Sequence, residues 1–352
     1  MMVDSAFIIE KSVVIVVVFA VTMIMAMYST WAERKVAAFL QDRVGPNRAG
    51  WGGLLQPLAD GMKLFSKEEF EPNTPNKFLF VLGPAIAMST ALMTSAVIPW
   101  GDHLEVFGRT VVLQATDINI GLLYFFGVVS VGVYGIMIGG WASNNKFSLM
   151  GAVRAASQMV SYEVAMGLSM IALLMMTGTL SLKEISLQQA EWHWNILYQP
   201  LSFLIFLICA FAETNRTPFD LAECESELIG GYHTEYSSMK MGFYLFAEYA
   251  NMFISATIIS VLFFGGYNYP GMAWMTEHAG VNIANVLGIA ALFAKICFWI
   301  FFYMWVRWTI PRFRYDQLMH LGWKILIPLS ILNIIVTGVV ILRHEIAVFL
   351  GF

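Results

Sequence analysis

An uncharged run that passes directly into an acidic segment decides the fold of this chain: Trp192-His-Trp-Asn-Ile-Leu-Tyr-Gln-Pro-Leu-Ser-Phe-Leu-Ile-Phe-Leu-Ile-Cys-Ala-Phe-Ala212, then Glu213-Thr-Asn-Arg-Thr-Pro-Phe-Asp-Leu-Ala-Glu-Cys-Glu-Ser-Glu-Leu-Ile-Gly-Gly231. The run is long enough to cross a bilayer, because a helix needs about 20 residues to span roughly 30 Å of hydrocarbon. Six acids then lie between Glu213 and Glu235. Acids beside a membrane span are costly to desolvate, so we expect the function to centre on this acidic loop, residues 213–240.

Long apolar runs recur along the whole chain. Hydrophobic residues make up 58% of the 352 residues, charged residues make up 12%, and the mean hydropathy is +0.68, whereas a soluble domain carries about 25% charged residues. We therefore predict an all-α polytopic membrane protein, with a single membrane domain over residues 1–352 and eight transmembrane helices. The predicted spans are residues 12–32, 78–101, 118–145, 164–182, 192–212, 249–276, 279–306 (interrupted by Lys295) and 325–342.

The distribution of Lys and Arg predicts the orientation. Fifteen of these twenty residues lie in four loops on one side of the predicted membrane, residues 33–77, 142–157, 213–240 and 307–324. The positive-inside rule places these loops in the cytoplasm and both termini in the periplasm. Charged residues rather than a small-residue cleavage pattern follow residues 12–32, so we interpret this run as a retained first span and not as a signal peptide.

Several kinds of cofactor site are excluded by the residue types. Cys209, Cys224 and Cys297 are isolated and form no Cys-x-x-Cys pair, so the chain offers no iron–sulfur or zinc cradle. The six histidines fall in loops or at helix ends, which argues against haem ligation within the membrane. The chain has neither a Gly-x-Gly-x-x-Gly fingerprint nor a Walker motif. We predict no metal site, and any fixed redox cofactor would belong to partner proteins.

The first predicted inner loop, residues 33–77, contains an amphipathic pattern. Leu54, Leu55, Leu58, Met62 and Phe65 share one side of a helical wheel, and the opposite side is polar. This pattern predicts a helix that lies along the membrane surface. Such a helix either anchors the chain to lipid or forms one wall of an opening through which an amphiphilic molecule enters from the bilayer.

Three ionisable residues fall within predicted spans. Glu163 begins an apolar run about one turn inside the membrane, and Glu248 lies about two turns inside. Glu163 either compensates a helix dipole or holds and releases a proton. Lys295 has a depth similar to that of Glu248, so Glu248 is either functional or part of a structural pair with Lys295.

The acidic loop itself allows two interpretations. Glu223, Glu225 and Glu227 alternate along the chain, so they cannot share one helical face, and their repulsion predicts coupled titration. A run of charges is usually solvated. Here Phe219 and three aliphatic residues interleave the acids, which favours packing inside the protein. Positive-inside anchoring explains the Arg content of the later basic segment, Arg307–Met319, but not its continuation Asp316-Gln-Leu-Met319.

Taken together, seven segments resemble one family, the H subunits of bacterial NADH:quinone oxidoreductase (respiratory complex I), whose mitochondrial counterpart is NADH dehydrogenase subunit 1. The resemblance runs from Glu33 to Lys324, and Cys224 departs from it because the family more often has Gly there. The segments are Glu33-Arg-Lys35, Arg43-Val-Gly-Pro-Asn47, Leu55-Gln-Pro-Leu-Ala-Asp60, Lys63-Leu-Phe65, Glu213-Thr-Asn-Arg-Thr-Pro-Phe-Asp-Leu221, Glu225-Ser-Glu-Leu228 and Pro311-Arg-Phe-Arg-Tyr-Asp-Gln-Leu-Met319.

The resemblance implies a membrane component of a large complex in the bacterial inner membrane, which docks a hydrophilic arm and other membrane subunits and binds no nucleic acid. Its substrate would be a quinone, ubiquinone or menaquinone, while NADH, FMN and iron–sulfur clusters would belong to partner subunits. Carried over to this sequence, the wall of the quinone tunnel would include Arg34, Arg43, Lys63, Phe219 and Asp220. The carboxylates that couple quinone reduction to proton translocation would be Glu163, Glu213, Glu223, Glu225, Glu227 and Glu248.

Two other classes of membrane protein share part of this pattern. The homologous membrane component of a membrane-bound hydrogenase or formate hydrogenlyase would share the helices but not the quinone chemistry, and the nearly intact first-loop and Thr-Pro-Phe-Asp motifs favour the quinone enzyme. A secondary transporter would usually show internal repeats with broken helices in matching positions. The halves of this chain show no such repeat, and its conspicuous loops all lie on one predicted side.

Overall fold

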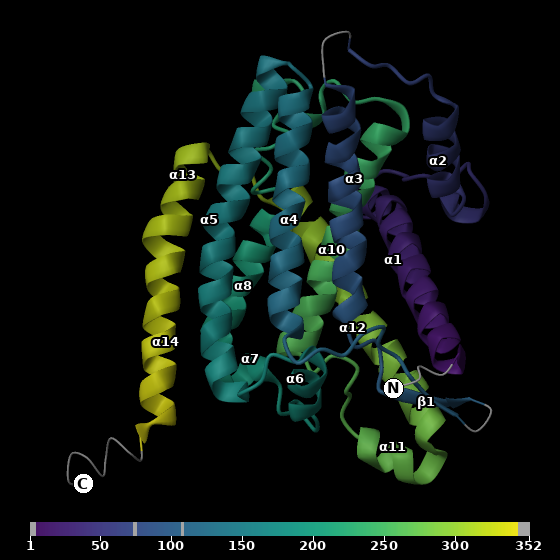
Figure 1. Cartoon of the computed structure of the whole chain (residues 1–352), viewed down its shortest axis with the longest axis vertical. Helices are drawn as coiled ribbons and strands as arrows, with labels where there is room; N and C mark the ends of the chain where they lie inside the picture. The colour runs from purple at the N-terminus through teal and green to yellow at the C-terminus, as the bar shows by residue number, and fades with distance from the viewer. Residues whose placement is uncertain (1–4, 73–75, 107–108, 344–352) are drawn as a thin grey trace.

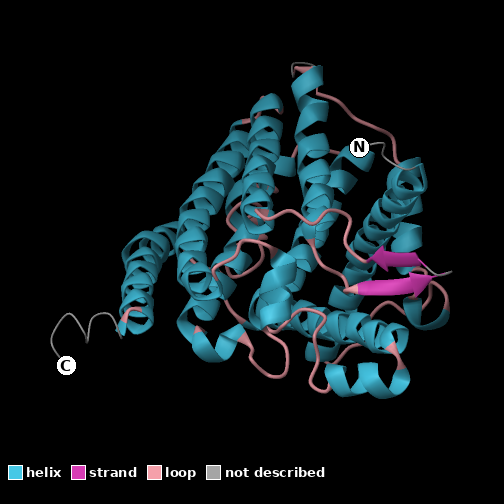
Figure 2. Ribbon diagram, turned by 60° about the horizontal axis from the view of Figure 1, so that its bottom comes forward, coloured by secondary structure: helices cyan, strands magenta, loops and turns pink. Residues whose placement is uncertain are grey.

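The computed structural model describes residues 5–72, 76–106 and 109–343. Over these ranges the chain is mainly helical and has almost no strand (Figure 2). The strands β1 (His103–Val106) and β2 (Arg109–Val112) form one antiparallel hairpin, with Leu104 opposite Val111. The prediction of an all-α polytopic protein is confirmed.

Within the described residues, seven helical segments are long and apolar enough to cross a membrane, which leaves the predicted count of eight unconfirmed. They are α1 (Ser5–Leu40), α3 (Lys77–Thr94) with η2 (Ser95–Val97), α4 (Gly121–Ala142), α5 (Lys146–Thr177), α10 (Ser238–Phe263), α12 (Val281–Thr309), and the continuous α13 (Tyr315–His320), η4 (Leu321–Leu326) and α14 (Ile327–Ile341).

The predicted span over residues 192–212 is broken into two helices. The short helix α7 (Asn195–Tyr198) ends at Gln199, whose backbone is not helical (φ −130°, ψ 56°), and α8 (Pro200–Glu213) begins with the next residue. Its 14 residues extend only about 21 Å at 1.5 Å per residue, which is less than the roughly 30 Å of a hydrocarbon core.

The helix boundaries differ from the predicted spans because an uncharged run marks a membrane-compatible stretch rather than the ends of a helix. α5 begins at Lys146, where the side chain of Asn145 accepts a hydrogen bond from the Phe147 amide (2.9 Å), and it ends at Gly178, which has a left-handed backbone (φ 68°). Glu163 therefore lies near the middle of α5 and not one turn inside its start, as the apolar run alone suggests.

The long helices stand roughly parallel in a bundle (Figure 1). α3 packs on α4, α4 on α5, α5 on both α8 and α14, and α10 on α3. α1 and the short helix α2 (Gln56–Ser66) flank one side, and α14 flanks the other. α1 begins and α14 ends at the end of the bundle that carries the hairpin, α6 (Leu182–Gln188) and α11 (Met272–Ala279), opposite α2.

Two glycines set the close approach of α3 and α4. A Cβ at Gly83 would lie 2.8 Å from the Cα of Gly139, and a Cβ at Gly139 would lie 1.9 Å from the hydroxyl of Tyr244. Small residues allow membrane helices to approach closely in this way. The Tyr244 hydroxyl donates to the carbonyl of Gly135 (3.0 Å), so the gap between α3 and α4 also fixes α10, the helix that carries Glu248.

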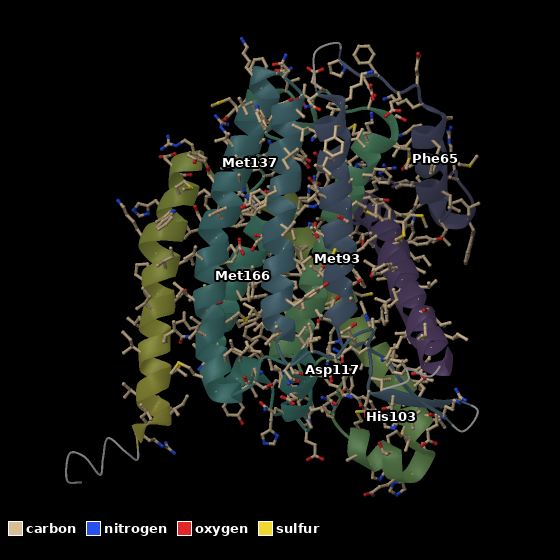
Figure 3. All side chains as sticks on the ribbon, viewed as in Figure 1. Phe65, Met93, His103, Asp117, Met137 and Met166 are labelled. Atoms are coloured by element: carbon tan, nitrogen blue, oxygen red, sulfur yellow. The ribbon has the colours of Figure 1, made fainter. Side chains whose placement is uncertain are left out.

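The predicted amphipathic helix is confirmed as α2. Met62 and Phe65 are 72% and 75% exposed, and Figure 3 shows Phe65 at the end of the bundle far from His103 and Asp117. The opposite face of α2 is attached to the bundle: Arg34 of α1 pairs with Asp60 (2.7 Å). Exposed apolar side chains on a surface helix fit lipid contact.

The structure does not form the Glu248–Lys295 pair that the sequence allowed. Lys295 Nζ lies 2.7 Å from each of three carbonyl oxygens, those of Phe264, Gly266 and Asn268, directly after α10. It also lies 5.7 Å from the centre of the Trp194 ring. Lys295 therefore satisfies the free carbonyls at the end of α10, as a basic residue near a helix C-terminus commonly does.

We expect Lys295→Met to destabilise the protein, because the three carbonyls lose a charged donor in a partly buried place. A hydrogen bond to a charged group contributes about 1.5–3 kcal/mol, and relief from desolvating the ammonium offsets part of the loss, so a net cost of about 2 kcal/mol is expected. The thermal inactivation midpoint of the detergent-extracted protein measures this, with Lys324→Met, at an exposed lysine, as the surface control. Equal midpoints for Lys295→Met and wild type would contradict this role.

Candidate functional site

The acidic loop is packed inside the protein rather than solvated. Arg216, Phe219, Asp220 and Leu221 are each less than 5% exposed. The side-chain amide of Gln158 on α5 holds the start of the loop by donating to the carbonyl of Ala212 (2.8 Å) and to the side-chain oxygen of Asn215 (3.1 Å). The interpretation that the apolar residues among the acids pack in the interior is therefore confirmed for Phe219, Leu221 and Leu228, but it is wrong for Ile229, which is 65% exposed.

Arg216 is the centre of a buried ion cluster. Its Nη1 lies 3.4 Å from Glu33 Oε2, its Nη2 lies 4.0 Å from Glu248 Oε2, and its guanidinium stacks 4.2 Å from the centre of the Tyr249 ring. Glu33 also pairs with Arg307 of α12 (2.6 Å). One loop residue thus joins α1, α10 and, through Glu33, α12.

Sequence reasoning missed the roles of Glu33, Arg216 and Arg307. The sequence did carry a signal for buried charges. Glu33 directly follows an uncharged run, and Arg216 is a lone basic residue near the start of the segment that contains the six acids. A carboxylate and a guanidinium that are both buried must be paired. The residues that share a pair, however, are 183 positions apart, and no local pattern reports such a contact.

Glu248 faces the loop from α10. The hydroxyl of Tyr232 donates to its Oε1 (2.8 Å), and Arg216 approaches its Oε2. In the described part of the chain, Arg216 Nη2 makes no hydrogen bond. The contact between Arg216 and Glu248 is thus the longest of the cluster, and the proton occupancy of Glu248 would change it most directly.

Two further pairs of ionisable side chains lie further along the loop. Asp220 binds Arg312 Nη2 (2.7 Å), and Glu223 lies 3.8 Å from His233 Nδ1. Burial, followed by the charge of Glu223, raises the pKa of Asp220 to about 7, although Arg312 and Arg216 oppose the rise. Asp220 therefore changes its charge near neutral pH, which is the property required of a group that exchanges protons.

The alternating glutamates of the loop have different surroundings. Glu223 is mostly buried, whereas the side chain of Glu227 is 54% exposed and pairs with Arg154 of α5 (2.6 Å). Glu227 therefore sits at the surface, away from the buried cluster. The side chain of Glu225 lies outside the described residues.

A cavity of about 50 Å³ connects the loop to the interior of the bundle. Both Glu213 and Glu248 line it, with Thr90, Asn251 and Ser255 as further polar groups. A buried water needs about 10–15 Å³ of such space together with polar partners, so the cavity has room for a few waters. Met166, midway along α5 in Figure 3, is part of its apolar wall. Water between Glu213 and Glu248 would allow protons to pass from one to the other.

Glu163 lies deeper, between α5 and α4. The hydroxyl of Ser130 on α4 donates to its Oε1. Glu163 lies near the middle of a 32-residue helix. It therefore does not compensate a helix dipole, because that effect is confined to the first and last turns of a helix.

Four of the five predicted tunnel-wall residues fall into two groups. Arg34 and Lys63 lie together around Asp60, at 2.7 and 3.6 Å. Phe219 packs between Tyr162 and Phe313, with ring centres 5.3 and 5.4 Å away, and it neighbours Asp220 in the acidic loop.

Arg43, the fifth predicted residue, is exposed and donates to the side chain of Gln41 (2.7 Å) in the chain that follows α1. The structure thus places two predicted residues on α1 and α2, two in the acidic loop and one at the surface.

Comparison with known proteins gives one consistent result. A family model described as NADH dehydrogenase matches residues 12–338. The chain is 86% identical over 349 residues to the H subunit of NADH-quinone oxidoreductase from Flavobacterium johnsoniae, covering 99% of this chain and all of the relative. It is 65% identical over 336 residues to the first of the H subunits from Cytophaga hutchinsonii, covering 96% and 98%. The chain therefore belongs to the family of NADH-quinone oxidoreductase H subunits, membrane components of an oxidoreductase complex.

Proposed function

We propose that this chain forms part of the quinone-binding cavity of a proton-pumping NADH:quinone oxidoreductase and couples quinone reduction to proton translocation. The observation that carries the proposal is the row of buried charged groups from Asp220 and Glu223 through Arg216 to Glu248, which reaches the cavity beside Glu213. Quinone, ubiquinone or menaquinone, is the substrate. NADH, FMN and iron–sulfur clusters belong to partner subunits.

The coupling has a physical basis in the low dielectric of the cluster. Reduction of a quinone to a quinol takes up two electrons and two protons, so charge changes at the cavity wall before protons arrive. In a water-poor site such a change acts strongly on nearby ions. Arg216 has two buried carboxylates within 4.0 Å, so a shift of its guanidinium or a proton taken up by Glu248 passes the change into the bundle.

The surroundings of the chain follow from the same proposal. It is embedded as one domain in the bacterial inner membrane with both termini in the periplasm, and the α2 end of the bundle docks the hydrophilic arm. Other membrane subunits pack on its flanks. Relatives at 86% identity that are named as H subunits of NADH-quinone oxidoreductase favour this function over that of a hydrogenase component or a secondary transporter.

Gentle detergent extraction through a tag on this chain tests the proposed function. We expect to recover a large assembly with inhibitor-sensitive NADH:quinone activity. Recovery of the chain alone in an active form would contradict the proposal, and so would an intact assembly that oxidises NADH but reduces no quinone.

The raised pKa of Asp220 predicts a pH dependence of stability. The folded chain keeps a proton on Asp220 up to a pKa of about 7, whereas an unfolded aspartate releases it near pH 4. Between these values the folded state binds more protons, so stability falls as pH rises. We expect the thermal midpoint of the wild type to fall more steeply between pH 5 and about 7 than that of Asp220→Asn. Parallel curves would show that Asp220 is ionised throughout.

A further inference from the structure

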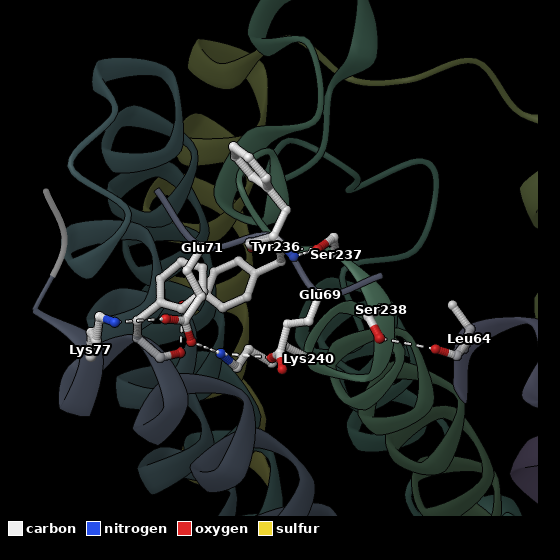
Figure 4. Close-up of polar contacts among 10 residues, drawn as sticks. Leu64, Glu69, Glu71, Lys77, Tyr236, Ser237, Ser238 and Lys240 are labelled. Carbon is white, nitrogen blue, oxygen red and sulfur yellow. Dashed lines mark hydrogen bonds and ion pairs between the residues drawn. The ribbon is translucent and has the colours of Figure 1, made fainter. Parts of the chain in front are cut away.

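The segment that leaves α2 is fastened to the start of α10. We call residues 67–71 the strap. The amide of Phe70 donates to the Ser237 hydroxyl (3.0 Å), and that hydroxyl donates to the Phe70 carbonyl (3.4 Å). The next residue of α10, Ser238, donates its hydroxyl to the carbonyl of Leu64 on α2 (3.0 Å). Figure 4 shows these contacts side by side.

Lys240 closes this attachment. Its ammonium lies 2.7 Å from Glu69 Oε1 and 2.5 Å from Glu71 Oε1, as Figure 4 shows, and 5.3 Å from the centre of the Phe80 ring. The side chain of Lys240 is only 13% exposed, whereas that of Glu69 is 51% exposed. Because the base is shielded from water and has two carboxylate partners, the contact is stronger than an ordinary surface pair.

The pair stays ionised at physiological pH. A hydrogen bond from Lys240 and its positive charge lower the pKa of the Glu71 carboxyl below its usual range. A carboxyl whose pKa is lowered by folding contributes to stability above its pKa in the unfolded state. This stabilisation is lost as pH falls through its pKa in the folded state. The attachment is therefore closed at neutral pH.

The attachment gives α2 two fixed points on different helices. Arg34 pairs with Asp60 and ties α2 to α1, while Lys240 ties the strap to α10. α1 also carries Glu33 and α10 carries Glu248, the two carboxylates that flank Arg216. α2 therefore bridges the two helices that hold the central charge cluster, with its apolar face directed outward.

We propose that Lys240 is a positioning residue for quinone: with Glu69 and Glu71 it forms a latch that holds α2 in the geometry in which α2 serves as a wall of the quinone opening. This inference rests on the proposed quinone cavity. When the latch is open, only the neutral hydrogen bonds of Ser237 and Ser238 join the α2 segment to α10, so α2 samples other positions more often. The apparent affinity for quinone then falls with the fraction of time that the wall is in place.

The test compares kinetic constants of the whole complex in native membranes. Lys240→Met removes the latch and Lys240→Arg retains its charge. Lys77→Met is the matched control, because Lys77 touches the same Glu71 at 3.4 Å but is 79% exposed. We expect Lys240→Met to raise the KM for a long-tailed quinone about tenfold at nearly constant kcat. Lys240→Arg restores most of the affinity, and Lys77→Met behaves as wild type.

Two outcomes would overturn the latch. One is an unchanged KM in an assembled Lys240→Met complex, and the other is an equal change in Lys77→Met. If Lys240→Met fails to assemble, the double variant Glu69→Gln/Glu71→Gln opens the latch from its exposed side and leaves α10 unaltered. Its KM is then expected to rise in the same way, and an unchanged value would again overturn the proposal.

Phe219→Ala, measured in the same series, separates this inference from the proposed function. If the KM changes in Phe219→Ala but not in Lys240→Met, the proposed quinone cavity is supported and only the latch is contradicted. If the KM changes in neither variant, the proposed quinone cavity itself is contradicted. Hydrogen exchange supplies a readout that does not depend on activity: amides of residues 56–71 exchange faster in Lys240→Met than in Lys77→Met if the latch holds α2. Equal exchange rates contradict it.

Discussion

Replacing Arg216 by Met is expected to cause one of the largest losses in this protein, in both assembly and quinone-linked activity. The side chains of Arg216 and Glu33 are 5% and 8% exposed, and that of Glu248 is 13% exposed. Removal of Arg216 leaves Glu248 without a basic partner and leaves Glu33 paired with Arg307 alone. Breaking a buried pair from one side costs about 3–5 kcal/mol. Native gels, thermal midpoints and NADH:quinone activity measure the effect.

Arg154→Met is the matched control for Arg216→Met. Arg154 also pairs with a glutamate of the acidic loop, Glu227, at 2.6 Å, but Glu227 is 54% exposed. A pair with an exposed partner contributes about 0–1 kcal/mol, so this variant is expected to assemble and turn over normally. In the double variant Arg216→Met/Glu248→Gln, stability should return in part, because the uncompensated charge of Glu248 is gone, while quinone-linked activity stays low. An Arg216→Met complex with full activity would contradict the central place of this cluster.

Gly231→Ala is expected to prevent the acidic loop from forming. Gly231 has a left-handed backbone (φ 61°), and a Cβ there would lie 1.8 Å from the carbonyl oxygen of Ala222 and 2.8 Å from its carbon. Both are backbone atoms, so the overlap is relieved only if the loop moves. The strained backbone alone costs about 1–3 kcal/mol for a residue other than glycine. Tyr232 follows directly, so its bond to Glu248 is lost with the loop.

The neighbouring glycine supplies the control. Gly230 has a negative φ (−160°), outside the left-handed region, and a Cβ there would meet only side-chain atoms, the nearest being Thr234 Oγ1 at 3.4 Å. Gly230→Ala is therefore expected to leave the amount of assembled complex and its NADH:quinone rate close to wild type. Similar behaviour of Gly230→Ala and Gly231→Ala would show that the loop is not held in the described conformation.

Features that depend on residues close together in the sequence were predicted well. The apolar runs gave the helical class, the wheel pattern over residues 54–67 gave α2, and the apolar residues among the acids indicated a packed loop. These signals are local, because burial against lipid or protein selects residue types at fixed spacing. The family resemblance also came from contiguous motifs, and the comparisons confirm it.

Features set by distant contacts were predicted poorly. Glu248 was considered as a partner of Lys295 because both lie at a similar depth in the predicted membrane. Instead, Lys295 faces the residues that follow α10 and contacts three of their carbonyls. Glu227 was grouped with Glu223, but the chain between them places Glu227 at the surface while Glu223 is mostly buried. The non-helical backbone of Gln199 breaks the predicted span and leaves α8 with only 14 residues. The uncharged run of sequence did not predict this break.

The central claim is that buried carboxylates couple quinone reduction to proton movement, and it is tested most directly by proton translocation in proteoliposomes that contain the assembled complex. Glu213→Gln and Glu248→Gln keep the size of the side chains that line the cavity and remove their ability to exchange protons. Because a positioned proton-transfer group accelerates its step by about a hundredfold or more, we predict that quinone-linked translocation falls by about that factor in each variant, while NADH:ferricyanide activity is retained. Normal assembly with full quinone-linked proton translocation in both variants would contradict the claim.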